Sequence, residues 1–282
     1  MTPAMPPRHS SISFISLSGV GICGAGFDNW DGTRAILAGG QPWRAIASEV
    51  PAFARLPAAE RRRVSKIVNF AMTAGFEAIT GAGMDAAIVP TVFATSSADG
   101  ENCHSICAAL AARDPMEHMI SPTRFHNSVQ NAAAGYWAIA TRSMAASTTL
   151  SALDGSFAAA LLEAYAVLAA GAPEVLAIAF DGPYPEPLHS KRPIGLPMSV
   201  GLALRAVPGP DDLAHIRVDL QAQGELQAHT TPMADSEFER VRAGSPTGRS
   251  LPLLQRVARR DPGSVVLDYV DGLGVRVEVR IP

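Results

Sequence analysis

The chain has 282 residues, a net charge of −3, 17% charged residues and 48% hydrophobic residues. This length suffices for one large domain with its own core, and the weak charge without a basic stripe excludes a nucleic-acid surface. Three cysteines form no disulfide framework, and neither a signal peptide nor an apolar run of membrane-spanning length is visible, so we expect a cytoplasmic protein.

The first hundred residues read as alternating strands and helices. Residues 1–10 are Pro-rich and expected to be loose, Ser11–Ile22 alternates like a strand, and Thr91–Ser96 is a second, buried strand. Helices are expected over Trp30–Ala38 and Ala58–Gly81. The segment GVGICGAG superficially resembles a dinucleotide-binding loop, but its glycine spacing differs and no acidic residue follows at the expected place.

Three polar clusters in this half invite functional readings. Arg61–Arg63 is either a solvated helix end or a contact for an anionic ligand or an acyl carrier, and we favour the solvated end. The C-H-x-x-C run from Cys103 to Cys107, within an expected helix over Glu101–Ala112, lacks a second ligand pair and is read as a buried thiol pair. His126 is read as a capping or surface residue rather than a catalytic one. We therefore expect neither a metal nor a cofactor.

The stretch Thr148–Asp181 organises the chain. It reads as a strand, a turn at Asp154-Gly155, a helix over Ser156–Ala170, a Gly-Ala-Pro stop and a second buried strand. The helix is apolar on every face apart from Glu163, which predicts that it is buried. A buried helix between buried strands indicates an α/β fold, and such folds commonly place their chemistry where the helix begins.

The remaining chain is simpler. A Pro-rich loop or lid follows Asp181, and Met198–Val207 is a strand. A weakly structured run comes next, then helices around Ser236–Arg242 and Leu251–Arg259. Ser264–Ile281 is a hairpin of two alternating strands joined at Asp271-Gly272.

These segments together resemble a known family. The run ISPTRFHNSVQNAAAG, then a strand, a small turn, an Ala-rich helix and the strand GAPEVLAIAFD, is similar to the N-terminal half of β-ketoacyl synthases, members of the thiolase-fold superfamily. The resemblance implies a thiolase-like layered fold (helix–sheet–helix). We expect one domain over residues 1–282, with a synthase-like core over 11–207 and a shortened C-terminal portion over 208–282.

The same resemblance assigns site residues. In the family a cysteine nucleophile lies in a T-A-C-x-S/T-G-like turn that opens the buried helix, and counting from Gly135 and from Gly171 puts Asp154 in its place, or Leu153 if one residue is gapped. Residues implied to bind substrate are Asn131, Gly155, Ser156 and Phe157, with Gly272 and Gly274 in a hairpin that would supply part of an oxyanion hole.

The departures from the family pattern concern its chemistry. Neither position 153 nor 154 is Cys, Ser or Thr, and the H-G-T-G-T motif is absent. Downstream of Asp154 the histidines are His189, His215 and His229, none in a family-like context. We expect Asp154 to cap the helix by accepting from the N–H of Ser156 or Phe157, and as a nucleophile it would yield only a mixed anhydride. The chain resembles stand-alone members found with aryl-polyene or fatty-acid-like assembly systems.

Three functions compete on this evidence. The first is a non-condensing partner of an active ketosynthase, like a chain-length factor, in fatty-acid or polyketide biosynthesis on acyl-carrier-protein thioesters. Its heterodimer or homodimer surface would comprise Ala145–Ser151 and the Asn131–Ala140 helix, whose small residues suit close packing. The second is an acyl-thioester hydrolase or decarboxylase that uses Asp154 with His126 or His189. The third is a free-standing acyl-binding module.

Overall fold

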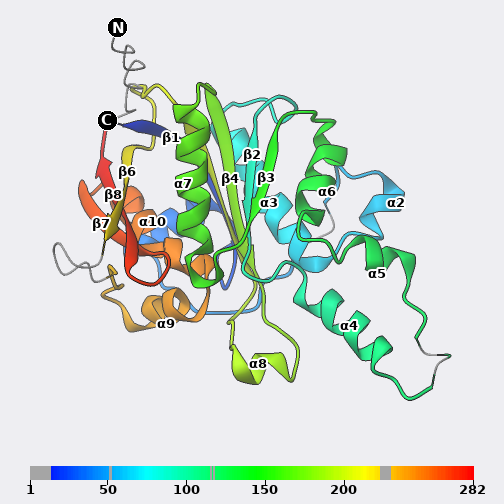
Figure 1. The fold of residues 1–282 in the computed structure, drawn as a ribbon. Coiled ribbons are helices and arrows are strands. Elements are labelled where there is room, and N and C mark those ends of the chain that lie inside the picture. Colours follow the sequence, from blue (N-terminus) through cyan, green and yellow to red (C-terminus); the bar gives the residue numbers. More distant parts are fainter. Residues whose placement is uncertain (1–13, 51–52, 115, 117, 223–229) are drawn as a thin grey trace, which may run out of the picture.

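A computed structural model describes residues 14–50, 53–114, 116, 118–222 and 230–282. These residues form one eight-stranded sheet of order β3-β2-β4-β5-β1-β6-β8-β7, with helices on both faces (Figure 1). The strands are β1 (Ile15–Gly24), β2 (Thr91–Ala94), β3 (Ser147–Leu150), β4 (Glu174–Asp181), β5 (Met198–Arg205), β6 (Ala214–Ala222), β7 (Gly263–Asp268) and β8 (Leu273–Arg280). The loose segment expected over residues 1–10 lies outside the described residues.

The helices alternate with these strands, and most lie close to their expected positions. They are α1 (Trp30–Leu37), α2 (Ala58–Arg61), α3 (Lys66–Gly81), α4 (Gly100–Leu110), α5 (Pro122–His126), α6 (Ala132–Thr141), α7 (Ser156–Ala169), α8 (Leu188–Lys191), α9 (Ser236–Gly244) and α10 (Leu251–Arg259). Two 3₁₀ turns, η2 (Leu153–Gly155) and η3 (Thr247–Ser250), precede α7 and α10. The α/β helix–sheet–helix arrangement is the expected fold class.

The sheet joins a parallel part to an antiparallel part. Strand β2 pairs in parallel with β3 and with β4, so all three strands end at the same edge of the sheet. Beyond them, β5, β1, β6, β8 and β7 pair antiparallel in turn. The C-terminal hairpin β7–β8 is therefore part of the same sheet, as the alternation of its residues predicts.

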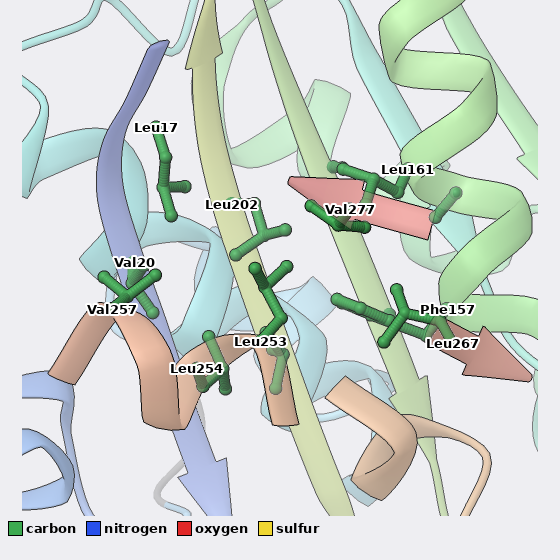
Figure 2. Close-up of a cluster of buried hydrophobic side chains, with 14 of the residues drawn as sticks. Leu17, Val20, Phe157, Leu161, Leu202, Leu253, Leu254, Val257, Leu267 and Val277 are labelled. Atoms are coloured by element: carbon green, nitrogen blue, oxygen red, sulfur yellow. The ribbon is translucent and has the colours of Figure 1, made fainter. Parts of the chain in front are cut away.

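Each face of the sheet has its own core. On one face α3 and α6 pack against the sheet through a cluster that includes Phe76 and Trp137, whose rings lie 4.4 Å apart. On the other face α7 and α10 bury side chains against the strands (Figure 2). There, Leu253 and Leu254 of α10 lie near β1 and β5, and Phe157 of α7 lies beside Leu267 of the hairpin.

The glycines of GVGICGAG serve packing rather than a nucleotide. A Cβ atom on Gly21 would lie 2.0 Å from the Ala74 carbonyl oxygen, and one on Gly19 would lie 2.2 Å from that of Ala78. Because α3 approaches β1 this closely, only glycine fits at these two positions. The glycine pattern is therefore explained by the contact between a helix and a strand.

The prediction of a single helix over Ala58–Gly81 is wrong, because the segment forms two helices, α2 and α3, with a break between them. Ser65 is extended, with φ −77° and ψ 161°, and α3 begins after it. The side-chain amide of Asn127 donates to the Arg63 carbonyl at 2.7 Å. In an unbroken helix that carbonyl would accept from the N–H four residues later, so a contact from a distant segment holds the break in place.

Two further expectations were wrong. The run after Val207 is not weakly structured: β6 lies there, and its buried Ile216 and Val218 alternate with polar residues. Helix α4 projects from the body with α5 (Figure 1), so its cysteines are no buried pair: Cys103 is half-buried and Cys107 exposed.

Helix α7 is also less buried than its composition predicts. Its first six residues are buried, but Ala166 and Ala169 near its end are exposed and Leu162 and Glu163 are half-buried. The sheet packs against the inner side of the helix. The outer side of α7 is rich in alanine, whose small side chain can face water with little loss of free energy. The apolar composition of the helix was therefore not sufficient to predict burial on every face.

Candidate functional site

The candidate site lies where the three parallel strands end. Strand β3 ends at Leu150 and leads through η2 into α7, β2 leads into Thr95 and Ser96, and β4 ends at Asp181. In α/β sheets this edge is where ligands usually bind, because helix N-termini and loops converge there. The Ser151 hydroxyl donates to the Thr95 carbonyl at 2.6 Å, which ties the ends of β3 and β2 together.

The turn between β3 and α7 is a strained elbow with Leu153 at its tip. Leu153 has φ +49°, a left-handed conformation that a branched apolar residue rarely adopts, and its side chain is 62% exposed. The Ser156 hydroxyl donates to the Leu153 carbonyl at 2.7 Å and accepts from the Ala152 N–H at 3.1 Å. Such a strand-to-helix turn presents its tip residue to the site, as in enzymes that carry their nucleophile on an elbow.

Gly155 brings the C-terminal hairpin against this elbow. A Cβ atom on Gly155 would lie 2.2 Å from the carbonyl oxygen of Tyr269, which follows β7. Phe157, two residues further along the chain, is buried beside Leu267 (Figure 2). Gly155, Ser156 and Phe157 therefore lie together, next to the hairpin that the sequence had associated with them.

Asp154 does not cap α7, contrary to expectation. The cap position is Gly155, and no side chain accepts from the first-turn N–H groups among the described contacts. Instead the carboxylate of Asp154 contacts Arg192 at 2.8 Å and Arg249 at 3.3 Å, and its side chain is 50% exposed. The 3₁₀ turn places Asp154 before the helix proper, and two guanidinium groups attract its carboxylate more strongly than backbone N–H groups do.

These contacts are one end of a chain of ion pairs. Arg249 also contacts Asp268 at 3.2 Å, Asp268 contacts Arg242 at 2.8 Å, and Arg242 contacts Glu239 at 2.7 Å. This series of ion pairs thus links η2, the segment after α8, η3, β7 and α9. The hydrogen bond from Arg242 lowers the pKa of Glu239 and, in return, the bond to Glu239 raises the pKa of Arg242. The elbow is therefore fastened to the C-terminal portion through alternating charges.

Asp181 is a site residue that the sequence reasoning treated only as the end of a strand. It is fully buried and accepts from the Ser96 N–H and hydroxyl, both at 2.7 Å, from Thr247 at 2.9 Å and from Thr95 at 3.3 Å. Burial away from water raises its pKa to about 6, against the opposing effect of these hydrogen bonds. The signal was an acidic residue directly after the apolar run from Val175 to Phe180.

The other candidate residues lie apart from the elbow or make other contacts. Asn131 is exposed at the start of α6, Gly272 has φ +77° in the hairpin turn, and Gly274 lies in β8. Of the histidines, His126 is exposed on α5 and His189 lies on α8, whereas His215 contacts Asp212 at 3.3 Å. His229 lies outside the described residues.

Two surfaces adjoin the elbow. A groove of about 410 Å³ is lined by residues of β3, of α7 and of the segments that follow β3 and β7, namely Leu150, Ser151, Ala152, Ala159, Leu162, Glu163, Ala166 and Tyr269. Strand β3 is the last strand of the sheet, so its outer edge is unpaired within the described chain. Large apolar side chains are exposed on the segments before that edge and on α6, namely Phe125, Val129, Ile139 and Met144.

Two negative findings complete the description of the site. Within the described residues, no group of three or more His, Cys, Asp or Glu side chains is arranged to hold a metal ion. In the same residues, no helix is both long and apolar enough to cross a membrane.

Comparison with solved structures places the fold. A chain of the ketosynthase (ApeO) and chain length factor (ApeC) complex from Xenorhabdus doucetiae is 20% identical, with 94% of this chain and 99% of that chain aligned and a TM-score of 0.67. The ishigamide ketosynthase/chain length factor gives 12% identity, 95% and 99% coverage and a TM-score of 0.72. A β-ketoacyl synthase from Burkholderia phymatum STM815 is 12% identical, with 96% of this chain and 100% of that chain aligned and a TM-score of 0.69.

Identities this low show a shared fold, the thiolase-like α/β fold of ketosynthases. No curated protein matches the chain. The family model described as the β-ketoacyl synthase N-terminal domain matches residues 38–257, which is most of the sequence. The chain therefore belongs to the β-ketoacyl synthase N-terminal domain family.

Proposed function

We propose that this chain is a non-condensing subunit that pairs with an active ketosynthase in the cytoplasm. The pair would elongate acyl-carrier-protein thioesters in fatty-acid or polyketide biosynthesis, aryl polyenes included. The ketosynthase would supply the nucleophile, and this chain would complete the assembly without reacting itself.

One observation carries this proposal: the elbow is present and its nucleophile is not. The left-handed tip of the turn is Leu153, whose side chain has no atom able to accept an acyl group. The next residue, Asp154, directs its two carboxylate oxygens at Arg192 and Arg249. A carboxylate held in this way is a weak nucleophile, and its acyl product would be an anhydride, higher in energy than the thioester consumed.

The unpaired edge of β3 supports a partner at that place. A sheet edge with free backbone groups can pair with a strand from another chain. Beside it, Met144 is 97% exposed, and Ile139 on α6 is also exposed. Exposed apolar side chains next to an open edge are typical of a surface that another subunit covers. Structures similar in fold include a ketosynthase in complex with its chain length factor, which favours a ketosynthase over a second copy of this chain.

A carrier protein is the second proposed partner. Arg61, Arg62 and Arg63 are all exposed at the break between α2 and α3. Arg61 donates to the Ala54 carbonyl and Arg63 contacts Glu60 at 3.2 Å, so the guanidinium groups are held at the surface. Such a group of cations suits the acidic surface of a carrier protein by attraction between opposite charges.

The thioester hydrolase alternative is less well supported. It needs a base beside Asp154, but the described polar contacts of that carboxylate are with Arg192 and Arg249, and His126 is exposed on α5. An acyl-thioester hydrolysis assay with the wild-type chain and Asp154→Asn separates the two ideas. Turnover that Asp154→Asn abolishes would establish the hydrolase.

Co-expression with any ketosynthase whose gene adjoins the gene for this chain tests the pairing. We expect a stable one-to-one complex by size exclusion with light scattering. Met144→Glu combined with Ile139→Glu should dissociate it, because two charges would be buried unpaired. Leu220→Glu, at an exposed apolar position on β6, is the matched control and should leave the complex intact. A chain that stays monomeric with every co-encoded ketosynthase would contradict the proposal.

A further inference from the structure

Two thiols lie on helix α4, away from the elbow. Cys103 and Cys107 both belong to this helix, which stands away from the body of the molecule (Figure 1). Neither forms a disulfide; Cys103 is half-buried and Cys107 is exposed. Neither takes part in the ion pairs that hold the elbow. The two cysteines are therefore a pair of soft, metal-binding side chains that the proposed function leaves unused.

The spacing of the two cysteines puts both thiols on one side of the helix. Residues four apart are neighbours on a helix surface, with about 5–6 Å between their Cβ atoms. The pKa of Cys103 agrees with this placement: partial burial raises it first, and the negative charges of Asp99 and of the Cys107 thiolate raise it further. Asp99 caps the helix one turn earlier. The two sulfur atoms therefore lie near each other, beside a carboxylate.

The same spacing disfavours a disulfide between the two cysteines. A disulfide needs Cβ atoms about 3.5–4.5 Å apart, closer than a regular helix brings residues four apart. The helix is regular on both sides of the pair, since the Cys103 N–H donates to the Asp99 carbonyl and the Ala111 N–H to the Cys107 carbonyl, both at 3.0 Å. Closing the ring would require α4 to unwind. Both thiols are therefore free to act as ligands while the helix is intact.

The number of ligands selects the kind of metal ion. Structural zinc takes four ligands in a tetrahedron, and calcium and magnesium take oxygen ligands. Within the part of the chain that the structure describes, no third His, Cys, Asp or Glu side chain completes a group with the two thiols. His104 directly follows Cys103 and so lies about 100° further around the helix. Two thiolates without further ligands suit a soft monovalent ion such as Cu(I).

We propose that Cys103 and Cys107 bind one Cu(I) ion between their sulfur atoms on the surface of α4. Each thiol releases its proton to solvent as its sulfur bonds to the metal, so the products are a singly negative dithiolate complex and two protons. The copper arrives and remains as Cu(I), so no electron is transferred. This site is separate from the elbow and does not depend on pairing with a ketosynthase.

Anaerobic titration of the full chain with Cu(I) buffered by bicinchoninate tests the site, because the coloured bicinchoninate complex reports the copper that the protein does not hold. We expect the wild type to withdraw one Cu(I) per chain. Cys103→Ser and Cys107→Ser should each weaken binding about tenfold or more, since one soft ligand is lost. Cys23→Ser removes the third thiol, which is buried and donates to the Phe70 carbonyl, and should leave the affinity unchanged.

A rearranged pair tests the spacing itself. Cys107→Ser combined with Ser105→Cys keeps two thiols on α4 but places them two residues apart, where side chains do not face each other. We expect this variant to bind Cu(I) as weakly as Cys107→Ser alone. Binding as tight as that of the wild type would overturn the proposal. So would a wild-type chain of native circular dichroism that withdraws no copper from bicinchoninate.

Two further results would also overturn it. One Cu(I) per two chains, together with a dimer in size exclusion, would show that the ion bridges the exposed Cys107 residues of two molecules. A disulfide between Cys103 and Cys107 that forms under a mild oxidant without loss of helical circular dichroism would show that the thiols are closer than the helix spacing implies. All these measurements use the chain alone, so they are independent of the test of the proposed function.

Discussion

A cysteine placed at the tip of the elbow should become a reactive thiol. Leu153 is 62% exposed and lies three residues before Ser156, the first residue of α7, a helix of 14 residues. A helix N-terminus stabilises a thiolate by about 1 kcal/mol or somewhat more, which lowers an ordinary thiol pKa of about 8.5 to about 7.5. We therefore expect Leu153→Cys to create a thiol of lowered pKa.

The expected gain in reactivity follows from two opposing effects. At pH 7 a thiol pKa of about 7.5 gives a roughly eightfold larger thiolate fraction than one of about 8.5, while the intrinsic nucleophilicity falls about threefold. Iodoacetamide should therefore alkylate the thiol introduced by Leu153→Cys about threefold faster than Cys107, which is exposed and serves as the internal reference. The pH midpoint of the reaction should fall by about one unit.

Matched variants show whether the helix end is responsible. Ala166→Cys lies on the exposed part of the same helix, far from its N-terminus, and its thiol should react like Cys107. Asp154→Cys tests the alternative register directly. If the thiol of Asp154→Cys is the activated one and that of Leu153→Cys reacts at the reference rate, the assignment of the tip to Leu153 is wrong. Equal rates for all three introduced thiols and Cys107 would refute the idea that the elbow retains any activating geometry.

Three other predictions concern stability. Folding raises the pKa of Asp181 from an ordinary value near 3.8 to about 6, so the native state binds this proton more tightly than the unfolded state does. The contribution of Asp181 to the free energy of unfolding should therefore fall by about 3 kcal/mol as the pH rises from about 4 to about 6. Urea unfolding of Asp181→Asn should lack this pH-dependent loss, and a pH profile identical to that of the wild type would contradict the prediction. Arg242→Met should lower the free energy of unfolding by about 3 kcal/mol, because Glu239 and Asp268 lose a guanidinium that is only 12% exposed. A loss below about 0.5 kcal/mol would mean that these ion pairs stabilise the fold no more than ordinary surface ion pairs do. Gly155→Ala should lower the free energy of unfolding by about 2 kcal/mol, because the new Cβ would lie 2.2 Å from the Tyr269 carbonyl oxygen. Gly135→Ala, with open space around it in α6, should raise the free energy of unfolding by roughly 0.5 kcal/mol. Equal effects of the two substitutions in thermal unfolding would disprove the close contact at Gly155.

The sequence indicated the parts of this fold that depend on local pattern. Alternation predicted the hairpin β7–β8, and the apolar run followed by Gly-Ala-Pro predicted α7 and β4. The break between α2 and α3 was invisible because Asn127, a residue far along the chain, holds it. Strand β6 was missed although its residues alternate between buried and more exposed positions.

The turn at the candidate site was predictable, and its contacts were not. The sequence placed a turn at Asp154-Gly155, and the structure has a 3₁₀ turn over Leu153–Gly155. The conformation of Leu153 and the partners of Asp154 were out of reach, because Arg192 and Arg249 come from distant segments and side-chain pairing over such separations leaves no periodic signal. The role of Asp181 depends likewise on Thr247, which the fold alone brings to it.

The most direct test of the proposed function is an elongation assay on the purified complex with the ketosynthase. We predict that the complex extends an acyl-carrier-protein thioester, that the ketosynthase alone does so at least tenfold more slowly, and that Asp154→Asn in this chain leaves the rate of the complex unchanged. Loss of elongation in an intact Asp154→Asn complex, or equal rates with and without this chain, would contradict the account.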